Sequence, residues 1–341
     1  MTRVAFFDTK PYDKVWFDRL CSEYDVEIVY FESKLNEKTS ALAAGYEVVC
    51  AFVNDSITEA VIETLYAGGT RLLAMRCAGY NNIDFKAAFG KIHVVRVPAY
   101  SPYAVAEHAM ALLLSSIRHT HHSYVRTREF NFSLNGLVGF DLHGKTIGVV
   151  GTGKIGRVFI DICKGFGMQV LAYDPYPDDK LGVTYCSFDQ LCKESDIISL
   201  HCPLTEETVH IINRDSIAMM KDQVVLINTS RGALVDSQAL LEGVRSKKIG
   251  AAALDVYEEE GEVFYEDKST TILDDDVLML LISMPNVLVT SHQAFLTREA
   301  LGNIARTTLA SIASYIKGDV MEHEICYQCD TCHKVIGQRC F

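Results

Sequence analysis

The chain has 341 residues, of which 49% are hydrophobic and 22% are charged. A chain of this length and composition can bury a large core and is expected to divide into two domains. Its formal net charge of -12 argues against a nucleic-acid partner or an anionic membrane partner, because an acidic surface repels both. A small anionic ligand would therefore need a local, positive binding point.

The N-terminus and the cysteines indicate the compartment. Met1 to Asp8 form a short apolar strand pattern without the basic stretch and long apolar region of a secretory signal. No uninterrupted apolar run reaches membrane-spanning length. The eleven cysteines are mostly scattered singly, which favours a reducing compartment over a disulfide framework. We expect a cytoplasmic protein.

The first part of the chain alternates short apolar or β-branched runs with helix-like segments. The expected strands are Val4–Phe7, Val26–Phe31, Val48–Phe52, Leu72–Arg76 and Val94–Val97. This alternation predicts a mostly parallel sheet covered by helices. Ser101-Pro102 then marks a helix start, with serine at the cap and proline in the first turn. Ala104–Ile117 is apolar almost all round, so we expect this helix to be buried between domains or subunits.

A second alternating series begins at Thr146 and predicts a doubly wound α/β domain. Its expected strands are Ile147–Val150, Val170–Tyr173, Ile197–Leu200, Val224–Asn228, Ala251–Asp255 and Val287–Thr290. The segment after Thr297 has a helical pattern and could return to the first domain. We therefore expect one discontinuous domain, residues 1–98 and 297–341, and one continuous domain, residues 99–296.

A GxGxxG motif lies between the first strand of the second series and the following helix. Gly151 permits a tight turn, Gly153 lets the backbone approach a pyrophosphate, and Gly156 lets helix and strand pack closely. The phosphates would lie at the helix N-terminus, where free N–H groups favour anions. The next strand ends at Asp174, at the spacing of an acid that binds the adenosine ribose hydroxyls and repels a 2′-phosphate. The motif and the acid together predict NAD rather than NADP; a structural turn with a surface aspartate is the alternative.

Three further expected strands are each followed by a charged or titratable residue that could take part in catalysis. Arg231 follows one strand, Glu258, Glu259 and Glu260 follow the next, and His292 follows the last. Because ligands bind at the carboxyl ends of parallel strands, an arginine, a carboxylate and a histidine should converge at one edge of the sheet.

These three functions suit hydride reduction of a 2-keto acid. Arg231 can bind the substrate carboxylate bidentately and polarise its carbonyl. His292 can donate the proton and accept it in the reverse direction. A nearby glutamate would orient the imidazole and stabilise its protonated form. Each residue alone could be structural, and spacing does not distinguish the three glutamates. The prediction rests on the convergence of an arginine, a carboxylate and a histidine beside a dinucleotide motif.

Together these motifs resemble those of the D-isomer-specific 2-hydroxyacid dehydrogenases, from about Arg3 to about Asp319. The resemblance rests on the stretches 151–156 (GTGKIG), 228–232 (NTSRG), 254–258 (LDVYE) with Glu260, and 291–295 (SHQAF). It implies a Rossmann-type NAD-binding domain and a flavodoxin-like catalytic domain. It also implies that Arg231, Glu260 and His292 are catalytic.

The resemblance further implies which residues contact the ligands. The cofactor contacts implied by the motif and the family are Gly151, Gly153, Lys154, Ile155, Gly156, Asp174, Cys202, Pro203, Thr229, Ser230 and Asp255. Within the family, residues 76–82, 98–102 and 264–269 look like those of the fermentative D-lactate dehydrogenases, which reduce pyruvate with NADH. That likeness implies that the backbone of Cys77, Ala78 and Gly79 holds the substrate carboxylate, and that Tyr100 and Phe52 border a small pocket.

Two alternatives to a D-lactate dehydrogenase remain open from the sequence. One is a dehydrogenase for bulkier 2-keto acids such as phenylpyruvate or 2-ketoisocaproate, and the other is a non-catalytic NAD-sensing scaffold on the same fold. Domain closure over the cofactor is expected, because hydride transfer benefits from excluded water. A homodimer through the long apolar helix is a further hypothesis.

Two clusters of cysteine and histidine residues, types that can bind metal ions, have no part in the predicted catalytic site. The tail carries Cys326, Cys329, Cys332, His333 and Cys340. These residue types can ligate zinc or an iron–sulfur cluster, but a second well-spaced ligand pair is absent. His119, His121 and His122 follow the apolar helix without a carboxylate or cysteine partner at ligand spacing. We expect no metal site, and a solvated or subunit-facing patch for the three histidines.

Overall fold

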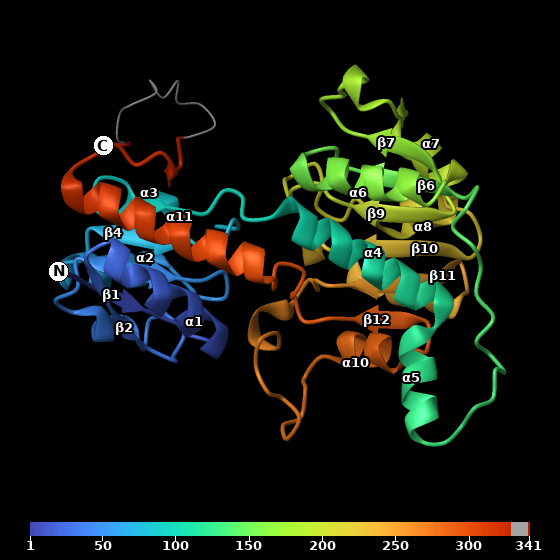
Figure 1. Cartoon of the computed structure of the whole chain (residues 1–341), viewed down its shortest axis with the longest axis horizontal. Helices are drawn as coiled ribbons and strands as arrows, with labels where there is room; N and C mark the ends of the chain where they lie inside the picture. The colour runs from blue at the N-terminus through green and yellow to red at the C-terminus, as the bar shows by residue number, and fades with distance from the viewer. Residues whose placement is uncertain (329–339) are drawn as a thin grey trace. The chain divides into compact units, whose positions relative to one another are not determined.

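The computed structural model describes residues 1–328 and 340–341 and divides into two compact units (Figure 1). Unit 1 comprises Met1–Ser101 and Thr297–Phe341, and unit 2 comprises Pro102–Leu296. The first break follows Ser101, whereas the sequence placed it after residue 98. Among the helices of the described residues, none is both long and apolar enough to cross a membrane.

Unit 1 contains a six-stranded sheet in the order β13-β5-β4-β3-β1-β2. The strands are β1 (Thr2–Phe6), β2 (Val26–Tyr30), β3 (Val48–Ala51), β4 (Leu72–Met75), β5 (His93–Val95) and β13 (Glu324–Ile325). The first five are parallel and follow the order 2-1-3-4-5, which is the flavodoxin-like arrangement. Only β13 is antiparallel, and it pairs with β5 at the edge. The flavodoxin-like fold implied by the resemblance is confirmed.

Helices cover this sheet and close its core. They are α1 (Pro11–Leu20), α2 (Glu59–Ala67), α3 (Phe85–Ala88) and α11 (Arg298–Lys317), with the short 3-10 helices η1 (Cys21–Glu23) and η2 (Ser40–Ala43). α11 follows unit 2 in the chain, yet its Leu309 and Ile312 share a core cluster with Val4 and Phe6 of β1. In Figure 1 it lies alongside the elements formed by the first hundred residues.

Unit 2 contains a seven-stranded parallel sheet in the order β12-β11-β10-β9-β6-β7-β8. The strands are β6 (Thr146–Val150), β7 (Gln169–Tyr173), β8 (Thr184–Tyr185), β9 (Ile197–Leu200), β10 (Val224–Asn228), β11 (Ile249–Leu254) and β12 (Val287–Val289). Numbered within the unit, the first six follow the Rossmann order 3-2-1-4-5-6, and β12 extends that sheet beyond β11. The expected Rossmann-type domain is confirmed.

Except for α5, which has no buried residue, the longer helices of unit 2 pack on the two faces of the sheet. They are α4 (Pro102–Arg118), α5 (Thr120–Arg128), α6 (Lys154–Gly165), α7 (Phe188–Glu194), α8 (Arg214–Met219), α9 (Ser237–Arg245) and α10 (Asp276–Ser283), with the 3-10 helices η3 (Asp179–Leu181), η4 (Gly232–Leu234) and η5 (Glu260–Glu262). One core cluster combines α4 and α6 with the sheet, and a second contains residues of α7 to α10.

The apolar helix α4 has a different explanation from the one that its sequence indicated. We expected burial between domains or subunits, but Ala109 and Leu113 pack with Phe159 and Ile160 of α6 in the core of unit 2 itself. The outward side of α4 includes the exposed Tyr103. Packing within one unit therefore accounts for most of its apolar residues.

Candidate active site

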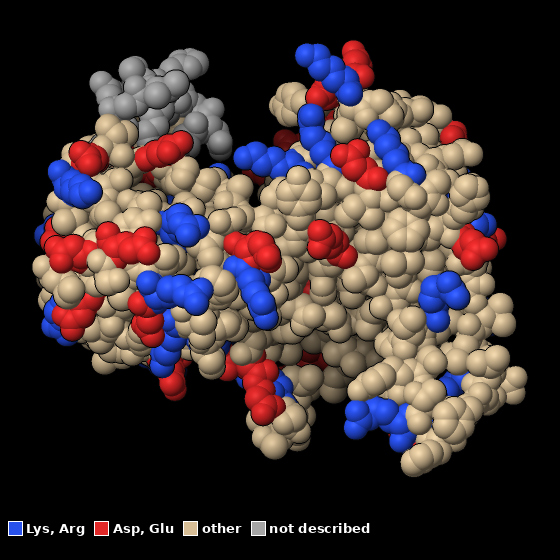
Figure 2. All heavy atoms as spheres, viewed as in Figure 1, with Lys and Arg blue, Asp and Glu red and all other residues tan. Residues whose placement is uncertain are grey.

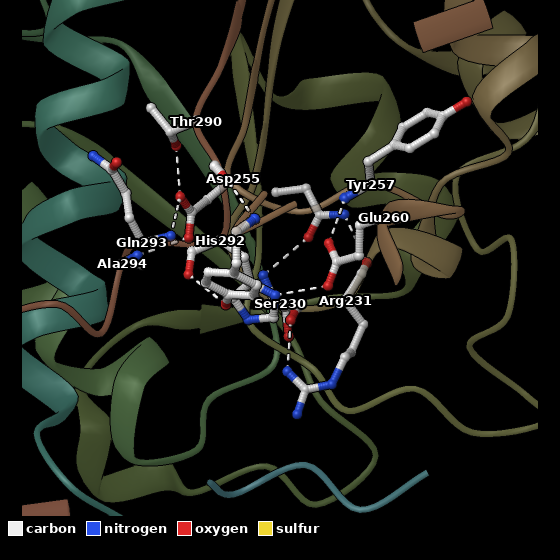
Figure 3. A network of polar contacts seen from close by, with 12 residues as sticks. Ser230, Arg231, Asp255, Tyr257, Glu260, Thr290, His292, Gln293 and Ala294 are labelled. Atoms are coloured by element: carbon white, nitrogen blue, oxygen red, sulfur yellow. Dashed lines mark hydrogen bonds and ion pairs between the residues drawn. The ribbon is translucent and has the colours of Figure 1, made fainter. Parts of the chain in front are cut away.

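Three neighbouring strands of unit 2 bring the expected catalytic residues together. β10, β11 and β12 pair in parallel, so the loops that follow them leave the sheet side by side. Arg231, Glu260 and His292 lie in these loops and gather at the carboxyl edge of the sheet (Figure 3). Ligands of open α/β sheets bind at this edge, which makes it the candidate active site.

His292 and Glu260 form a direct hydrogen bond, with 2.7 Å between Nδ1 and Oε1. The other carboxylate oxygen, Oε2, accepts a hydrogen bond from the backbone N–H of Tyr257 at 2.9 Å, which fixes the carboxylate. With Nδ1 turned toward the carboxylate, Nε2 is the ring nitrogen left to exchange a proton with a substrate.

The backbone of His292 is held in an unfavourable conformation. Its φ is 46°, in the left-handed region that a non-glycine residue adopts only when its surroundings stabilise it. The N–H of His292 donates to the Asp255 carbonyl at 2.7 Å, and the Tyr265 hydroxyl donates to the His292 carbonyl at 2.8 Å. These bonds orient the imidazole before any ligand binds.

The structure separates the three glutamates that the spacing left equivalent. Glu258 Oε1 lies 2.5 Å from His210 Nε2, and its Oε2 accepts a hydrogen bond from the Ser237 hydroxyl at 3.1 Å. Glu259 is exposed. Of the three carboxylates, the one hydrogen-bonded to His292 belongs to Glu260.

Asp255 is a buried carboxylate that holds the loop carrying His292. Oδ1 accepts hydrogen bonds from the Thr290 hydroxyl and the Gln293 N–H, and Oδ2 accepts one from the Ala294 N–H at 2.8 Å. His108 of α4 approaches the same carboxylate, with 3.2 Å between Nε2 and Oδ1. Burial acts to raise the pKa of Asp255, but these hydrogen bonds outweigh it and hold the pKa below its usual range.

Sequence reasoning did not find the residues that hold this loop. These residues include His108, Thr290 and Tyr265, and 182 positions separate His108 from Thr290 in the chain. The one signal in the sequence is that His108 lies inside the apolar stretch Ala104–Ile117, which by itself indicates a packed side chain. The partners of Asp255 became identifiable only when the fold brought α4 beside the ends of β11 and β12.

Arg231 is half-buried, and hydrogen bonds hold both its backbone and its guanidinium. Its carbonyl accepts a hydrogen bond from Asn228 Nδ2 at 2.8 Å, and its Nη1 donates to the Ser230 carbonyl at 2.7 Å. At the adjoining Gly232, an added Cβ would lie 2.0 Å from the Tyr257 carbonyl, so the two loops touch there. A guanidinium anchored in this way suits bidentate binding of a carboxylate.

The glycine motif has the geometry expected of a dinucleotide site. Gly151 has φ +95° and touches the backbone of Cys202, while a Cβ on Gly156 would lie 2.1 Å from the Gly151 carbonyl. Beside Gly153 the space is open, with no atom within 4 Å of a Cβ built there. Lys154 and Ile155 form the first turn of α6, whose N-terminal N–H groups are the donors available to a pyrophosphate.

Asp174, which follows β7, carries the acid of the nucleotide site. Its Oδ2 accepts hydrogen bonds from the N–H and the hydroxyl of Thr152, at 2.7 and 2.9 Å. Burial acts to raise its pKa, but the N–H groups of Thr152 and Tyr176 outweigh this effect and keep the pKa below its usual range. The carboxylate is therefore ionised at neutral pH, as binding of ribose hydroxyls and repulsion of a 2′-phosphate require.

The remaining expected cofactor contacts lie after β9 and β10. Cys202 and Pro203 follow β9, Thr229 and Ser230 follow β10, and the Ser230 hydroxyl donates to the Cys202 carbonyl at 2.6 Å. The Thr229 hydroxyl is buried and has no hydrogen-bond partner among the described residues. An unsatisfied buried hydroxyl and the open space at Gly153 both fit a bound NAD.

The residues expected to contact substrate lie in unit 1, at the carboxyl ends of its parallel strands. Phe52 follows β3, the stretch 77–79 follows β4, and Tyr100 lies beyond β5. Phe52 is buried, with its ring 4.6 Å from the Arg76 guanidinium. The carbonyl of Tyr100 accepts a hydrogen bond from Asn303 of α11 at 2.7 Å.

The structure describes only part of the possible metal-ligand clusters. Cys329, Cys332 and His333 lie outside the described residues, and Cys326 and Cys340 are half-buried. Within residues 1–328 and 340–341, no group of three or more histidine, cysteine or acidic side chains could hold a metal ion. His122 instead lies 2.6 Å from the Pro285 carbonyl through Nε2.

Comparisons with known proteins agree with this geometry. Residues 110–294 match the family model described as D-isomer specific 2-hydroxyacid dehydrogenase, NAD binding domain. The chain is 49% identical to a 2-hydroxyacid dehydrogenase homolog of Haemophilus influenzae, over 94% of this chain and 98% of that protein. It is 48% identical to the D-lactate dehydrogenase of Escherichia coli, over 95% and 99% of the two chains.

A solved structure described as the pyruvate reductase of Chlamydomonas reinhardtii has the same fold. It superimposes with a TM-score of 0.89 at 43% identity, covering 94% of this chain and 98% of that one. The matched motifs, the nucleotide site and the full-length similarity lead to one conclusion. The chain belongs to the D-isomer-specific 2-hydroxyacid dehydrogenase family and is an NAD-dependent dehydrogenase.

Proposed function

We propose that this protein reduces pyruvate to D-lactate with NADH, reversibly. The observation that carries the proposal is the 2.7 Å hydrogen bond between His292 Nδ1 and Glu260 Oε1 at the sheet edge that also carries Arg231. An acid, its orienting carboxylate and a cation for the substrate are the functions that this reaction needs. Relatives described as a D-lactate dehydrogenase and as a pyruvate reductase support pyruvate as the keto acid.

Each catalytic residue has one task in this reaction. Arg231 binds the pyruvate carboxylate and polarises the carbonyl. His292 donates its Nε2 proton to the carbonyl oxygen, and Glu260 stabilises the imidazolium at Nδ1. NADH supplies the hydride that adds to the carbonyl carbon. In the reverse direction His292 accepts the proton of the lactate hydroxyl.

The residues of unit 1 would select a small keto acid. We assign the backbone of Cys77, Ala78 and Gly79 to the substrate carboxylate, and Tyr100 and Phe52 to the border of the pocket. The packing of the Phe52 ring on Arg76 supports a rigid border of this kind, because its position does not depend on the ligand.

One assay compares pyruvate with bulkier keto acids. NADH oxidation is measured with pyruvate, phenylpyruvate and 2-ketoisocaproate, the product is analysed for chirality, and His292→Ala is measured alongside. We expect preferred turnover of pyruvate to D-lactate that the substitution abolishes. A preference for a bulky keto acid would contradict the assignment of Tyr100 and Phe52 to a small pocket. Tight NADH binding without turnover would indicate a non-catalytic scaffold.

A homodimer through the segment between α4 and β6 is part of this proposal. The arm, defined as residues 119–141, contains α5 and exposes Tyr124, Phe130, Leu134 and Val138, of which the last three are 85%, 78% and 88% exposed. So many large apolar side chains on one segment are typical of a surface covered by a protein partner. The arm, rather than the apolar helix α4 that the sequence indicated, is therefore the surface that a second copy would cover.

We also place the protein in a reducing compartment, the cytoplasm. Cys50 and Cys163 are buried cysteines without a disulfide, and burial raises the pKa of each thiol to about 12. Buried neutral thiols persist without a disulfide where the surroundings are reducing. Figure 2 shows basic and acidic side chains interspersed on the viewed face of unit 1, which gives a polyanion no continuous basic surface there.

A further inference from the structure

Arg96 connects the end of β5 to the loop that follows β4. Its Nη1 donates a hydrogen bond to the Ala78 carbonyl at 2.9 Å, and its guanidinium carbon lies 4.8 Å from the centre of the Tyr80 ring. The backbone of Arg96 is itself fixed, because its N–H donates to the His323 carbonyl beside β13 at 3.2 Å. Arg96 is thus fixed through its backbone, and its guanidinium contacts two residues of one short loop, Ala78 and Tyr80.

All three carbonyls of the stretch 77–79 are occupied within the protein. The Cys77 carbonyl accepts from the Val97 N–H at 3.1 Å, the Ala78 carbonyl accepts from Arg96, and the Gly79 carbonyl accepts from the Cys77 thiol at 3.2 Å. In a trans peptide the C=O and the following N–H point in opposite directions. The N–H groups of Ala78 and Gly79 therefore point away from the protein groups that hold the carbonyls.

These two N–H groups donate to no protein group in the described part of the chain. A hydrogen bond from a cation to a carbonyl also polarises the peptide and strengthens the N–H on its other side. The contact between Arg96 and the Ala78 carbonyl therefore acts on the N–H of Gly79, which belongs to the same peptide unit.

We propose that Arg96 is a positioning residue for the keto-acid substrate: by holding the Ala78 carbonyl it orients and polarises the Gly79 N–H that binds the substrate carboxylate. The inference rests on the proposed function, in which this loop receives the carboxylate. Arg96 acts on substrate affinity through the loop, whereas proton transfer belongs to His292. Loss of Arg96 should consequently raise KM for the keto acid and leave kcat nearly unchanged.

The test compares Arg96→Met with Arg96→Lys and with a matched control, Arg71→Met. Arg71 lies before β4, at its opposite end, donates to the Tyr66 and Thr70 carbonyls and stacks on the Tyr66 ring at 4.2 Å. It has the same kinds of contact without touching the loop. We expect Arg96→Met to raise KM for pyruvate about tenfold, as the loss of one charge-assisted hydrogen bond implies. Arg96→Lys should recover part of this, and Arg71→Met should leave KM unchanged.

A binding measurement keeps the inference separate from the identity of the substrate. The affinity of the NADH-loaded protein for oxamate, a carboxylate analogue of pyruvate, should weaken in Arg96→Met by the same factor as KM, while NADH affinity stays constant. If wild-type protein binds oxamate but turns over another keto acid, the proposed function fails and the oxamate comparison still decides the role of Arg96. Unchanged KM and oxamate affinity, or a joint loss of kcat, NADH affinity and thermal stability, would overturn the inference.

Discussion

Glu258 and Glu260 carry the same functional group two positions apart, and their neighbours give them different tasks. Glu260 is hydrogen-bonded to His292, whereas Glu258 contacts His210 and Ser237. We predict that Glu260→Gln lowers kcat for pyruvate reduction about 10²-fold, because the imidazolium loses the charge that stabilises it. Glu258→Gln is the control and should retain most activity. Equal losses of kcat in the two variants, measured by steady-state kinetics, would contradict the assignment.

Asp174 is the carboxylate that we expect to select NADH over NADPH. Its oxygens accept hydrogen bonds from Thr152 and Tyr176, which hold the negative charge at the end of β7, where we expect the adenosine ribose to bind. We predict that Asp174→Ala raises the ratio of kcat/KM for NADPH to that for NADH by about tenfold or more, since repulsion of the 2′-phosphate is removed. Steady-state kinetics with both cofactors measure the ratio, and a ratio equal to that of wild type would exclude this role.

At the scale of an element, the loop after β12 depends on one buried carboxylate. Asp255 accepts hydrogen bonds from Thr290, Gln293 and Ala294, and an amide in its place would set an NH2 group against N–H donors. We predict that Asp255→Asn lowers kcat and destabilises the protein by about 2 kcal/mol at pH 7.

The same residue makes a pH-dependent contribution to stability. The pKa of Asp255 is lower in the folded protein than its ordinary value, so its contribution is complete above about pH 4, the ordinary range of an aspartate. It is lost as the pH falls through the lowered value. The difference in Tm between wild type and Asp255→Asn should therefore be constant near neutrality and shrink below pH 4. Thermal unfolding from pH 7 to pH 3 measures it, and a gap that widens in acid would contradict the linkage.

At the scale of the whole molecule, the arm is the main apolar surface outside the two cores. Phe130, Leu134 and Val138 project from a segment whose helix α5 has no buried residue. We predict that the wild-type protein is a dimer and that Leu134→Asp with Val138→Asp makes it monomeric, because charges placed in an apolar interface lose their hydration. Light scattering after size exclusion gives the mass. Val15→Asp, at an exposed apolar residue of α1, is the control; a monomeric wild type would refute the dimer.

The sequence by itself determined two alternating α/β units with mostly parallel sheets, and the nucleotide motif. Alternating apolar runs with glycines and acids at strand ends are local patterns, and parallel strands always place their carboxyl ends at one edge. Arg231 and His292 could therefore be predicted to meet. The two-residue strands β8 and β13 could not, because so few residues give no periodicity.

Only the tertiary structure decided which contacts those residues make. Glu258 and Glu260 point in different directions because of the conformation of one loop. Only the structure therefore identifies Glu260 as the partner of His292. His108 and Asp255, which are in contact, are 255 − 108 = 147 positions apart in the chain. The hydrogen bond from Arg96 to the Ala78 carbonyl joins the loops that follow β5 and β4. The apolar residues of α4 likewise acquired their partner, α6, through packing. Sequence patterns record what each segment prefers, and long-range packing decides which polar groups then face one another.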